Sequence, residues 1–581
     1  MPSQKDTYAK QEETRLNLMK KYTIGIDFGA DELQTVLVNT ATGEEAASAS
    51  YKYPHGIITD QIPGTDIHLE PGWALHHPDD YLNGLKRTVP NLLKMSGISP
   101  DQIIGIGIDF QGSTVIPTND NGKPLALFEE YRNEPHAWPM MWEHTAAQNK
   151  ATLLTQLAND RFEPFLDRYG GQINAEWFFP KVWQIQDENL SVYHAADRLI
   201  EGSDWIVWQL TGEETRNLSA AGYKALWSKS EGFPLEPFFA AMDDGLTDVI
   251  DSKMKREILP LGQKAGELTE GAAKWLNLSP GTPVATGMIG PQTAVPAASI
   301  AEPGKMALVM GSIIKLLVLS KKEYRVPGMS GMVEDGIVPG LIGFEAEQAS
   351  GINHFDWFIR NGIPGDYLRE ARKHRITIDK LIKDKAQQLD PAESGLVVLD
   401  WWNGNRSILA DKDLTGLILG YSLSTKPEEI FRAIVEATTF GTRKIFETFI
   451  ASGVPINEII VVPNGTSENT LLFNILANVT RMEIKIAESS HACALGSAMY
   501  AAVAAGKENG GYRSIQDAVL KMARLKEKTF IPNNNDKKTY NRVYSEFTLL
   551  HDYFGYGHNN AMKRLRNLRD SIIEKKKRLS L

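Results

Sequence analysis

A segment that begins as an apolar strand turns at Gly290-Pro291, the kind of place where α/β folds put catalytic groups, yet the turn contains no acid. Residues 284–299 read "VATGMIGPQTAVPAAS", with no Asp or Glu. The ends of core strands in α/β folds are where such proteins place their reacting groups. A residue that removes a proton from a hydroxyl must be able to accept it, and glycine cannot. Carboxylates do occur in two other apolar runs, as Asp27 within 22–28 and Asp109 within 103–110.

Composition and charge limit the class of protein in which this chemistry would occur. The chain has 581 residues, of which 42% are hydrophobic and 23% are charged, and its net charge is -10. This length and composition predict two to four folded domains. The negative balance argues against a nucleic-acid or membrane partner, because both need clustered positive charge.

The compartment is predicted from the cysteine count and the N-terminus. Cys493 is the single cysteine, so no disulfide framework can form and a reducing cytoplasm is expected. The first 21 residues are polar and charged, without the apolar core of a signal peptide, and no run of about 18 apolar residues occurs. We therefore expect a soluble cytoplasmic protein.

The elements that must position these residues follow an α/β order. Residues 22–39 and 304–320 each predict two strands joined by a glycine-containing turn, and 103–110 predicts a buried strand. Helical spacing marks 134–280, whose aromatic residues we interpret as core, and marks 427–451, 470–480 and 493–506. Two α/β halves, each opening with such a hairpin, indicate a duplicated architecture with a cleft.

Ordered motifs along the chain give it a family resemblance. The chain resembles the FGGY carbohydrate kinases from about residue 22 to 572, and among them the bacterial L-ribulokinases most. This resemblance implies an α/β, two-domain, actin-like (ribonuclease-H-like) fold with a central cleft. It also implies a sugar-side domain at 22–298 and a nucleotide-side domain at 299–572. The composition adds a polar leader at 1–21 and a basic tail at 573–581. The motifs are "GIDFG" (25–29), "GWALHHPDDYL" (72–82), "EWFFPKVWQI" (176–185), "GSDWIVWQLTG" (202–212), "GYKALW" (222–227), "DWWNGNRS" (400–407), "LTGLILG" (414–420), "EATTFGTRKI" (436–445) and "LLHDYFGYG" (549–557).

The resemblance also assigns roles to residues, and several of the assigned positions depart from the family. Gly290 stands where the family has its catalytic Asp, whereas Asp27 keeps the metal-side carboxylate. The implied sugar-binding residues are Lys224, Glu345, Asp109 and Gly112. The implied nucleotide-binding residues are Gly29, Gly311, Ser312, Asn464, Gly465, Asn469 and Gly496, with family hydroxyls or glycines replaced around them by Ala30, Glu32, Gln34, Ile313, Ile314 and Pro463.

These departures lead to a main hypothesis and two alternatives. Because they concern the base, the phosphates and the nucleotide together, we predict a ribulokinase-like pseudokinase that binds a ketopentose or polyol without efficient phosphotransfer. The first alternative is an active kinase that uses Mg-ATP, with Asp109 or Glu345 as the base; the second is an interaction protein. In the main hypothesis no cofactor is needed, and a homo-oligomer or an active paralogue is a possible partner.

Overall fold

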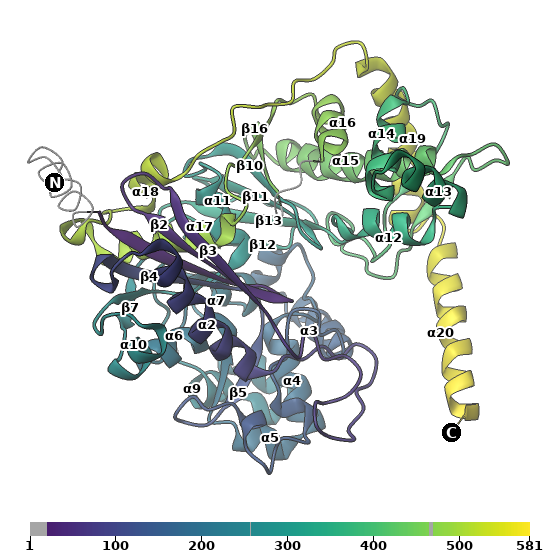
Figure 1. Cartoon of the computed structure of the whole chain (residues 1–581). Coiled ribbons are helices and arrows are strands. Elements are labelled where there is room, and N and C mark those ends of the chain that lie inside the picture. Colours follow the sequence, from purple (N-terminus) through teal and green to yellow (C-terminus); the bar gives the residue numbers. More distant parts are fainter. Residues whose placement is uncertain (1–19, 256, 464–468, 581) are drawn as a thin grey trace, which may run out of the picture. The chain divides into compact units, whose positions relative to one another are not determined.

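The chain folds into two compact units, each built on a β-sheet. The computed structural model describes residues 20–255, 257–463 and 469–580 (Figure 1). The first unit comprises residues 1–302, 332–343 and 491–524, and the second comprises 303–331, 344–490 and 525–581. The mixed α/β, two-domain prediction is confirmed. The predicted boundary at 298/299 stays a prediction. In the structure, two later segments, 332–343 and 491–524, also belong to the first unit.

The sheet of the first unit has the order β3-β2-β1-β4-β8-β7, with β9 also paired to β4. Strands β1 and β4 run parallel, whereas β1, β2 and β3 form an antiparallel meander. The strands are β1 (Tyr22–Phe28), β2 (Glu32–Asn39), β3 (Glu45–Lys52), β4 (Ile103–Phe110), β7 (Lys264–Glu267), β8 (Pro283–Ala285) and β9 (Met288–Ile289).

Helix α17 (Ala492–Ala505) packs against β1 and β4 in this unit (Figure 1). Its approach is close enough that glycine is required in the strands. A Cβ on Gly25 would lie 1.7 Å from Ala494 O, and one on Gly107 would lie 1.9 Å from Ser497 O. Glycine at these two positions therefore lets the helix backbone rest directly on the sheet.

The other helices of the first unit surround this sheet and an aromatic cluster. α2 begins after the His77 cap and ends at Gly97, which adopts a left-handed conformation. Residues Trp177, Phe178 and Phe179 are buried in one hydrophobic cluster, as expected for core aromatics. The elements are α2 (Pro78–Ser96), β5 (Val115–Thr118), α3 (Gln148–Asp160), α4 (Phe178–Glu188), α5 (Leu190–Ala195), β6 (Arg198–Glu201), α6 (Gly202–Thr211), α7 (Leu218–Lys224), α8 (Glu236–Met242), α9 (Val249–Lys253), α10 (Glu270–Leu276), α11 (Gly290–Ala297), β12 (Gly331–Glu334) and α18 (Ile515–Met522).

The second unit is built on strands paired in the order β13-β11-β10-β16-β17. β10 and β11 form the predicted antiparallel hairpin, and β10 pairs with β16 in parallel. The elements are β10 (Gly304–Val309), β11 (Ile314–Ser320), β13 (Ile342–Gln348), α12 (Asn353–Asn361), α13 (Gly365–His374), α14 (Ile378–Gln388), β14 (Val397–Leu399), β15 (Leu417–Leu419), α15 (Pro427–Ala451), β16 (Ile456–Val462), α16 (Thr470–Thr480), β17 (Ile484–Ile486), α19 (Lys537–Gly555) and α20 (Ala561–Ser580).

The strand predicted before Gly290 is broken, and the following residues are not a simple turn. β8 ends at Ala285 and β9 begins at Met288, and α11 begins at Gly290 itself. A Cβ on Gly287 would lie 3.0 Å from Ser203 Cβ, so α6 packs closely against the break. Pro291 stands in the first turn of α11, where its fixed φ suits a helix start. Within the described chain, no helix is both long and apolar enough to span a membrane.

Candidate functional site

Three strand ends in the first unit bring the singled-out residues Asp27, Asp109 and Gly290 together. Asp27 and Asp109 are register partners in the parallel β1/β4 pair. Asp109 is also the register partner of Met288 in β9, and Gly290 follows that strand directly. The carboxyl ends of parallel strands are the usual place for a site in this class of fold.

A side chain at position 290 would be directed at the two carboxylates. A Cβ added there would lie 2.8 Å from Asp109 Oδ1 and 3.7 Å from Asp27 Oδ1. The absence of a side chain leaves room for the Asp109 carboxylate, which borders the place where an acid at position 290 would begin. Thr293 Oγ1 lies 2.6 Å from Gly290 O and ties the first turn of α11.

Asp109 is fully buried, and one of its oxygens is held by α17. Ser497 Oγ donates a 2.6 Å hydrogen bond to Asp109 Oδ2. Asp109 Oδ1 has no hydrogen-bond partner within the described part of the chain. Ser497 therefore fixes one oxygen in place, and the other oxygen borders Gly290.

Burial dominates the electrostatics of this pair. Burial, and then the neighbouring Asp27 carboxylate, hold the pKa of Asp109 well above its usual value. Burial also raises the pKa of Asp27, and Glu32 adds to the rise, whereas His491 opposes it. Two such close carboxylates favour a state in which they share a proton.

The same residues include a group that could hold a metal ion. Ligand atoms of Asp27, Asp109 and Cys493 all lie within 4.8 Å of one another. Burial, followed by the charges of both aspartates, raises the pKa of the Cys493 thiol well above its usual value. Because a neutral thiol is a poor ligand, the donor set is two carboxylates, which suits a hard cation such as Mg²⁺.

The turn between β1 and β2 contains the predicted nucleotide residue Gly29. Gly29 N donates to Glu32 O at 3.0 Å, which closes a tight hairpin. The Glu32 carboxylate accepts a 2.8 Å bond from Gln34 Nε2. The turn therefore carries an acid beside Asp27, and that charge opposes a phosphate.

The predicted sugar residues Gly112 and Lys224 also lie in the first unit, near β9. A Cβ on Gly112 would meet Ile289 Cγ2 at 3.1 Å, so Gly112 borders the strand that leads to Gly290. Lys224 is the last residue of α7, a helix that packs beside β9. It is buried, with Nζ 5.5 Å from the centre of the Trp177 ring. Burial rules out the view of Lys224 as a surface charge.

The predicted sugar residue Glu345 lies in the second unit, where it belongs to an ion-pair cluster that the sequence did not reveal. Lys315 Nζ on β11 contacts the carboxylates of both Glu345 and Glu347 on β13. Arg406 Nη1 lies 2.9 Å from Glu347 Oε2. Burial opposes the charge on Lys315, but the two glutamates raise its pKa above the ordinary value. A lysine inside the apolar run "IIKLLVLS" was the available signal for this cluster.

The remaining predicted nucleotide residues have local structural roles where they are described. Gly311 O accepts from Ile352 N at 3.0 Å, and Ser312, which is exposed, accepts at its O from Gly351 N at 2.9 Å. Asn469 Oδ1 caps α16 through Leu472 N at 3.2 Å. A Cβ on Gly496 would lie 1.8 Å from Thr293 O, so this glycine allows α11 and α17 to pack. The predicted residues Asn464 and Gly465 lie outside the described residues.

Family models match both halves of the chain. The N-terminal domain of the FGGY family of carbohydrate kinases matches residues 22–295, and its C-terminal domain matches residues 306–505. The chain belongs to the FGGY family of carbohydrate kinases. The recognition made from the motifs is thereby confirmed.

Relatives named ribulokinase match almost the whole chain. A ribulokinase of Anoxybacillus flavithermus is 45% identical over 97% of this chain and 100% of its own length. A ribulokinase of Shouchella clausii is 47% identical over 95% of this chain and 98% of its own length. The chain is therefore a ribulokinase-like member of its family.

Solved structures agree on the fold. A xylulose kinase from Rhodospirillum rubrum superposes with a TM-score of 0.73 at 21% identity, covering 93% of this chain and 100% of the other. A glycerol kinase from Plasmodium falciparum, solved with ADP, has a TM-score of 0.70 at 16% identity, covering 91% and 98%. At these identities the likeness establishes the sugar-kinase fold alone.

Proposed function

We propose that this FGGY protein is an ATP-dependent kinase of the ribulokinase type, which transfers the terminal phosphoryl group of ATP to a hydroxyl of a ketopentose. The proposal is supported by relatives of that name at 45% and 47% identity over nearly the full length. The site contains the carboxylates of Asp27 and Asp109.

The observation that carries this proposal is the Asp109 carboxylate beside Gly290. The 2.8 Å between Asp109 Oδ1 and the Cβ position of residue 290 means that a proton acceptor borders the place where the family has its acid. Asp109 Oδ1 would accept the proton of the sugar hydroxyl as the oxygen attacks phosphorus, while Ser497 holds the other oxygen. A carboxyl whose pKa is raised by burial is a stronger base when it ionises.

Asp27 is the residue that we propose for the metal side. It is half-buried at the end of β1, and it offers carboxylate oxygens of the kind that Mg²⁺ accepts. When bound, magnesium neutralises the charge of the transferring phosphates. For the sugar, we propose Lys224 of the first unit as a hydrogen-bond donor. The sugar-binding role of Glu345 stays a prediction.

A second candidate function, sugar binding without phosphotransfer, is favoured by two features of the first unit. Gly290 carries no acid, and the β1/β2 turn places the Glu32 carboxylate beside Asp27. Such a protein would bind a ketopentose or polyol and act on a partner, either another copy or an active paralogue.

One pair of measurements separates the two functions. ADP release would be followed in a coupled assay with L-ribulose and other ketopentoses in the presence of Mg-ATP. Thermal unfolding would be followed with sugar alone, because a ligand at 100 times its Kd stabilises the folded state by about 2.7 kcal/mol. A kinase shows sugar-dependent ADP release, and its absence together with sugar stabilisation would replace the kinase proposal with the binding function.

A further inference from the structure

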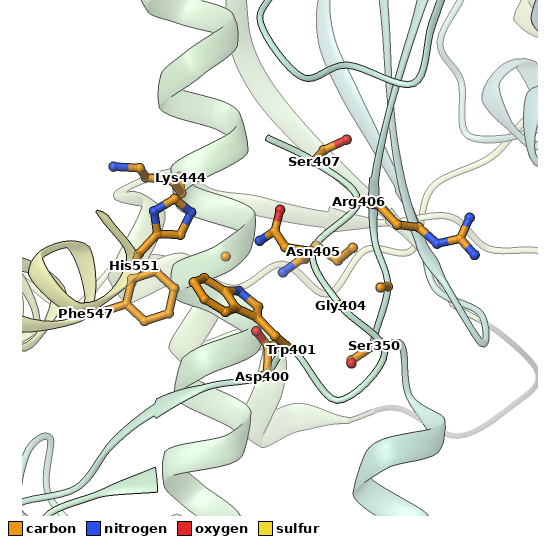
Figure 2. A pocket seen from close by; sticks show the side chains of 13 residues that line it. Ser350, Asp400, Trp401, Gly404, Asn405, Arg406, Ser407, Lys444, Phe547 and His551 are labelled. Carbon is orange, nitrogen blue, oxygen red and sulfur yellow. The ribbon is translucent and has the colours of Figure 1, made fainter. Parts of the chain in front are cut away.

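A small pocket lies within the second unit, in the loop that follows β14 and against α15 and α19 (Figure 2). The loop contains the motif "DWWNGNRS" (400–407), to which no role was assigned above. The pocket has a volume of about 20 Å³. That volume holds about one particle of the size of a water molecule.

Two buried oxygen atoms of residues that line this pocket make no hydrogen bond within the described part of the chain. Asp400 and Ser350 both line it, and they are 6% and 4% exposed. Asp400 Oδ2 and Ser350 Oγ have no hydrogen-bond partner among the residues that the structure describes. A buried polar atom left in this way costs about 1–3 kcal/mol, so a ligand that satisfies both atoms would be stabilised.

The positive groups that line the pocket already have partners. Lys444 Nζ lies 3.3 Å from Asp552 Oδ1, and Arg406 Nη1 lies 2.9 Å from Glu347 Oε2. Burial lowers the pKa of His551, which therefore favours its neutral form, and its Nδ1 lies 2.9 Å from Asp552 Oδ1. The lining cations are thus each matched by a carboxylate.

Asp400 is left as the negative group without a matching cation among these contacts. The Lys315, Arg406, Glu345 and Glu347 cluster contains two positive and two negative groups, so it contributes no surplus positive charge. Burial raises the pKa of Asp400 to about 7, the behaviour of a carboxyl that lacks a compensating charge.

We propose that this pocket binds one monovalent cation of about the size of water, K⁺ or ammonium, with Asp400 Oδ2 and Ser350 Oγ as ligands. One positive charge balances the Asp400 carboxylate, whereas a divalent ion would leave a surplus in a buried site. Mg²⁺ also gives up its bound waters reluctantly, and a volume of about 20 Å³ does not hold them beside the ion. An organic amine is too large for a volume of about 20 Å³. The proposal does not depend on the proposed kinase activity.

The test is the thermal unfolding of the full chain in KCl, NH₄Cl or choline chloride at equal ionic strength. Choline is the reference because it cannot enter the pocket. We expect a higher melting temperature in K⁺ or ammonium than in choline, and the larger shift identifies the cation. Asp400→Asn, which keeps the shape and removes the charge, should abolish the difference. The matched control Asp356→Asn, at an exposed acid of α12 in the same unit, should keep it.

A second measurement covers the case in which Asp400→Asn does not fold. Crystals of the unmodified protein soaked in rubidium chloride should show an anomalous peak beside Asp400 and Ser350. Equal melting temperatures in all three salts, or a wild-type shift that survives in Asp400→Asn, would show that the pocket holds only water. An empty rubidium map at this place would equally overturn the proposal.

Discussion

Replacing Asp109 with asparagine tests the proposed proton acceptor most directly. The amide has nearly the same shape, and it can still accept the hydrogen bond that Ser497 now donates at 2.6 Å. What it loses is the ability of Oδ1, beside Gly290, to take a proton. Loss of a positioned base lowers turnover by about 10²- to 10⁴-fold, which corresponds to about 2.7–5.5 kcal/mol in the activation free energy.

The effect on stability should go in the opposite direction. Because burial raises the pKa of Asp109, ionising it in the folded state is costly, and a neutral amide avoids that cost at alkaline pH. We therefore expect Asp109→Asn to unfold at the same temperature as the unmodified chain or a higher one. A protein that is inactive and still stable separates a lost base from a lost fold.

The assay is sugar-dependent ADP release, with kcat and KM measured for both substrates. We expect kcat to fall while KM for Mg-ATP stays close to that of the unmodified chain. Asp160→Asn, at an exposed acid at the end of α3, is the matched control and should leave both constants unchanged. An Asp109→Asn variant whose turnover stays within about threefold of the unmodified chain would refute the assignment of the base.

Three other variants test the surrounding structure. Gly290→Asp should not raise turnover, and it should lower the free energy of unfolding by about 1–3 kcal/mol, because its Cβ would meet Asp109 Oδ1 at 2.8 Å; a more active enzyme would contradict this. The raised pKa of Asp400, about 7, adds stability that is complete below the pKa of the unfolded chain and is lost as pH rises through 7. The unfolding free energy, measured with urea in choline buffer, should therefore fall with rising pH, and Asp400→Asn should reduce this fall; an unchanged pH dependence would count against it. Glu345→Gln leaves Lys315 with one carboxylate instead of two and should lower the unfolding free energy by about 1–3 kcal/mol in urea, and unaltered stability would argue against the ion pair.

Strong local patterns in the sequence predicted the regular elements well. The predicted helices 427–451 and 470–480 and the predicted strand 103–110 have the observed bounds of α15, α16 and β4. Each combines a long apolar periodicity with a clear start, such as Pro427 in the first turn of α15. The break between β8 and β9 was missed because it depends on α6 packing against Gly287, which no local pattern reveals.

Only part of the candidate site was predicted, because local motifs reveal some of its residues and tertiary contacts bring in the others. Asp27, Asp109 and Gly112 were singled out by their motifs, and strand register brings them to β9 and Gly290. Ser497 was not, since its bond to Asp109 joins residues 388 positions apart. The contact of Lys315 with Glu345 likewise depends on how β11 and β13 align. Such pairings arise from tertiary structure, and a single sequence does not encode them in any short pattern.

The packing of α17 on β1 and β4 has a consequence for how the protein is made. The strands of the first unit leave the ribosome early, but the helix that rests on Gly25 and Gly107 is encoded at 492–505. Until that part is synthesised, the face of the sheet that α17 covers has no partner from its own helix, and exposed strands of this kind favour aggregation. A chain that stops at residue 490 would contain Asp27, Asp109 and Gly290 yet lack the cover and the Ser497 donor. Residues 491–524, which come late in the chain, are therefore needed to finish folding the first unit.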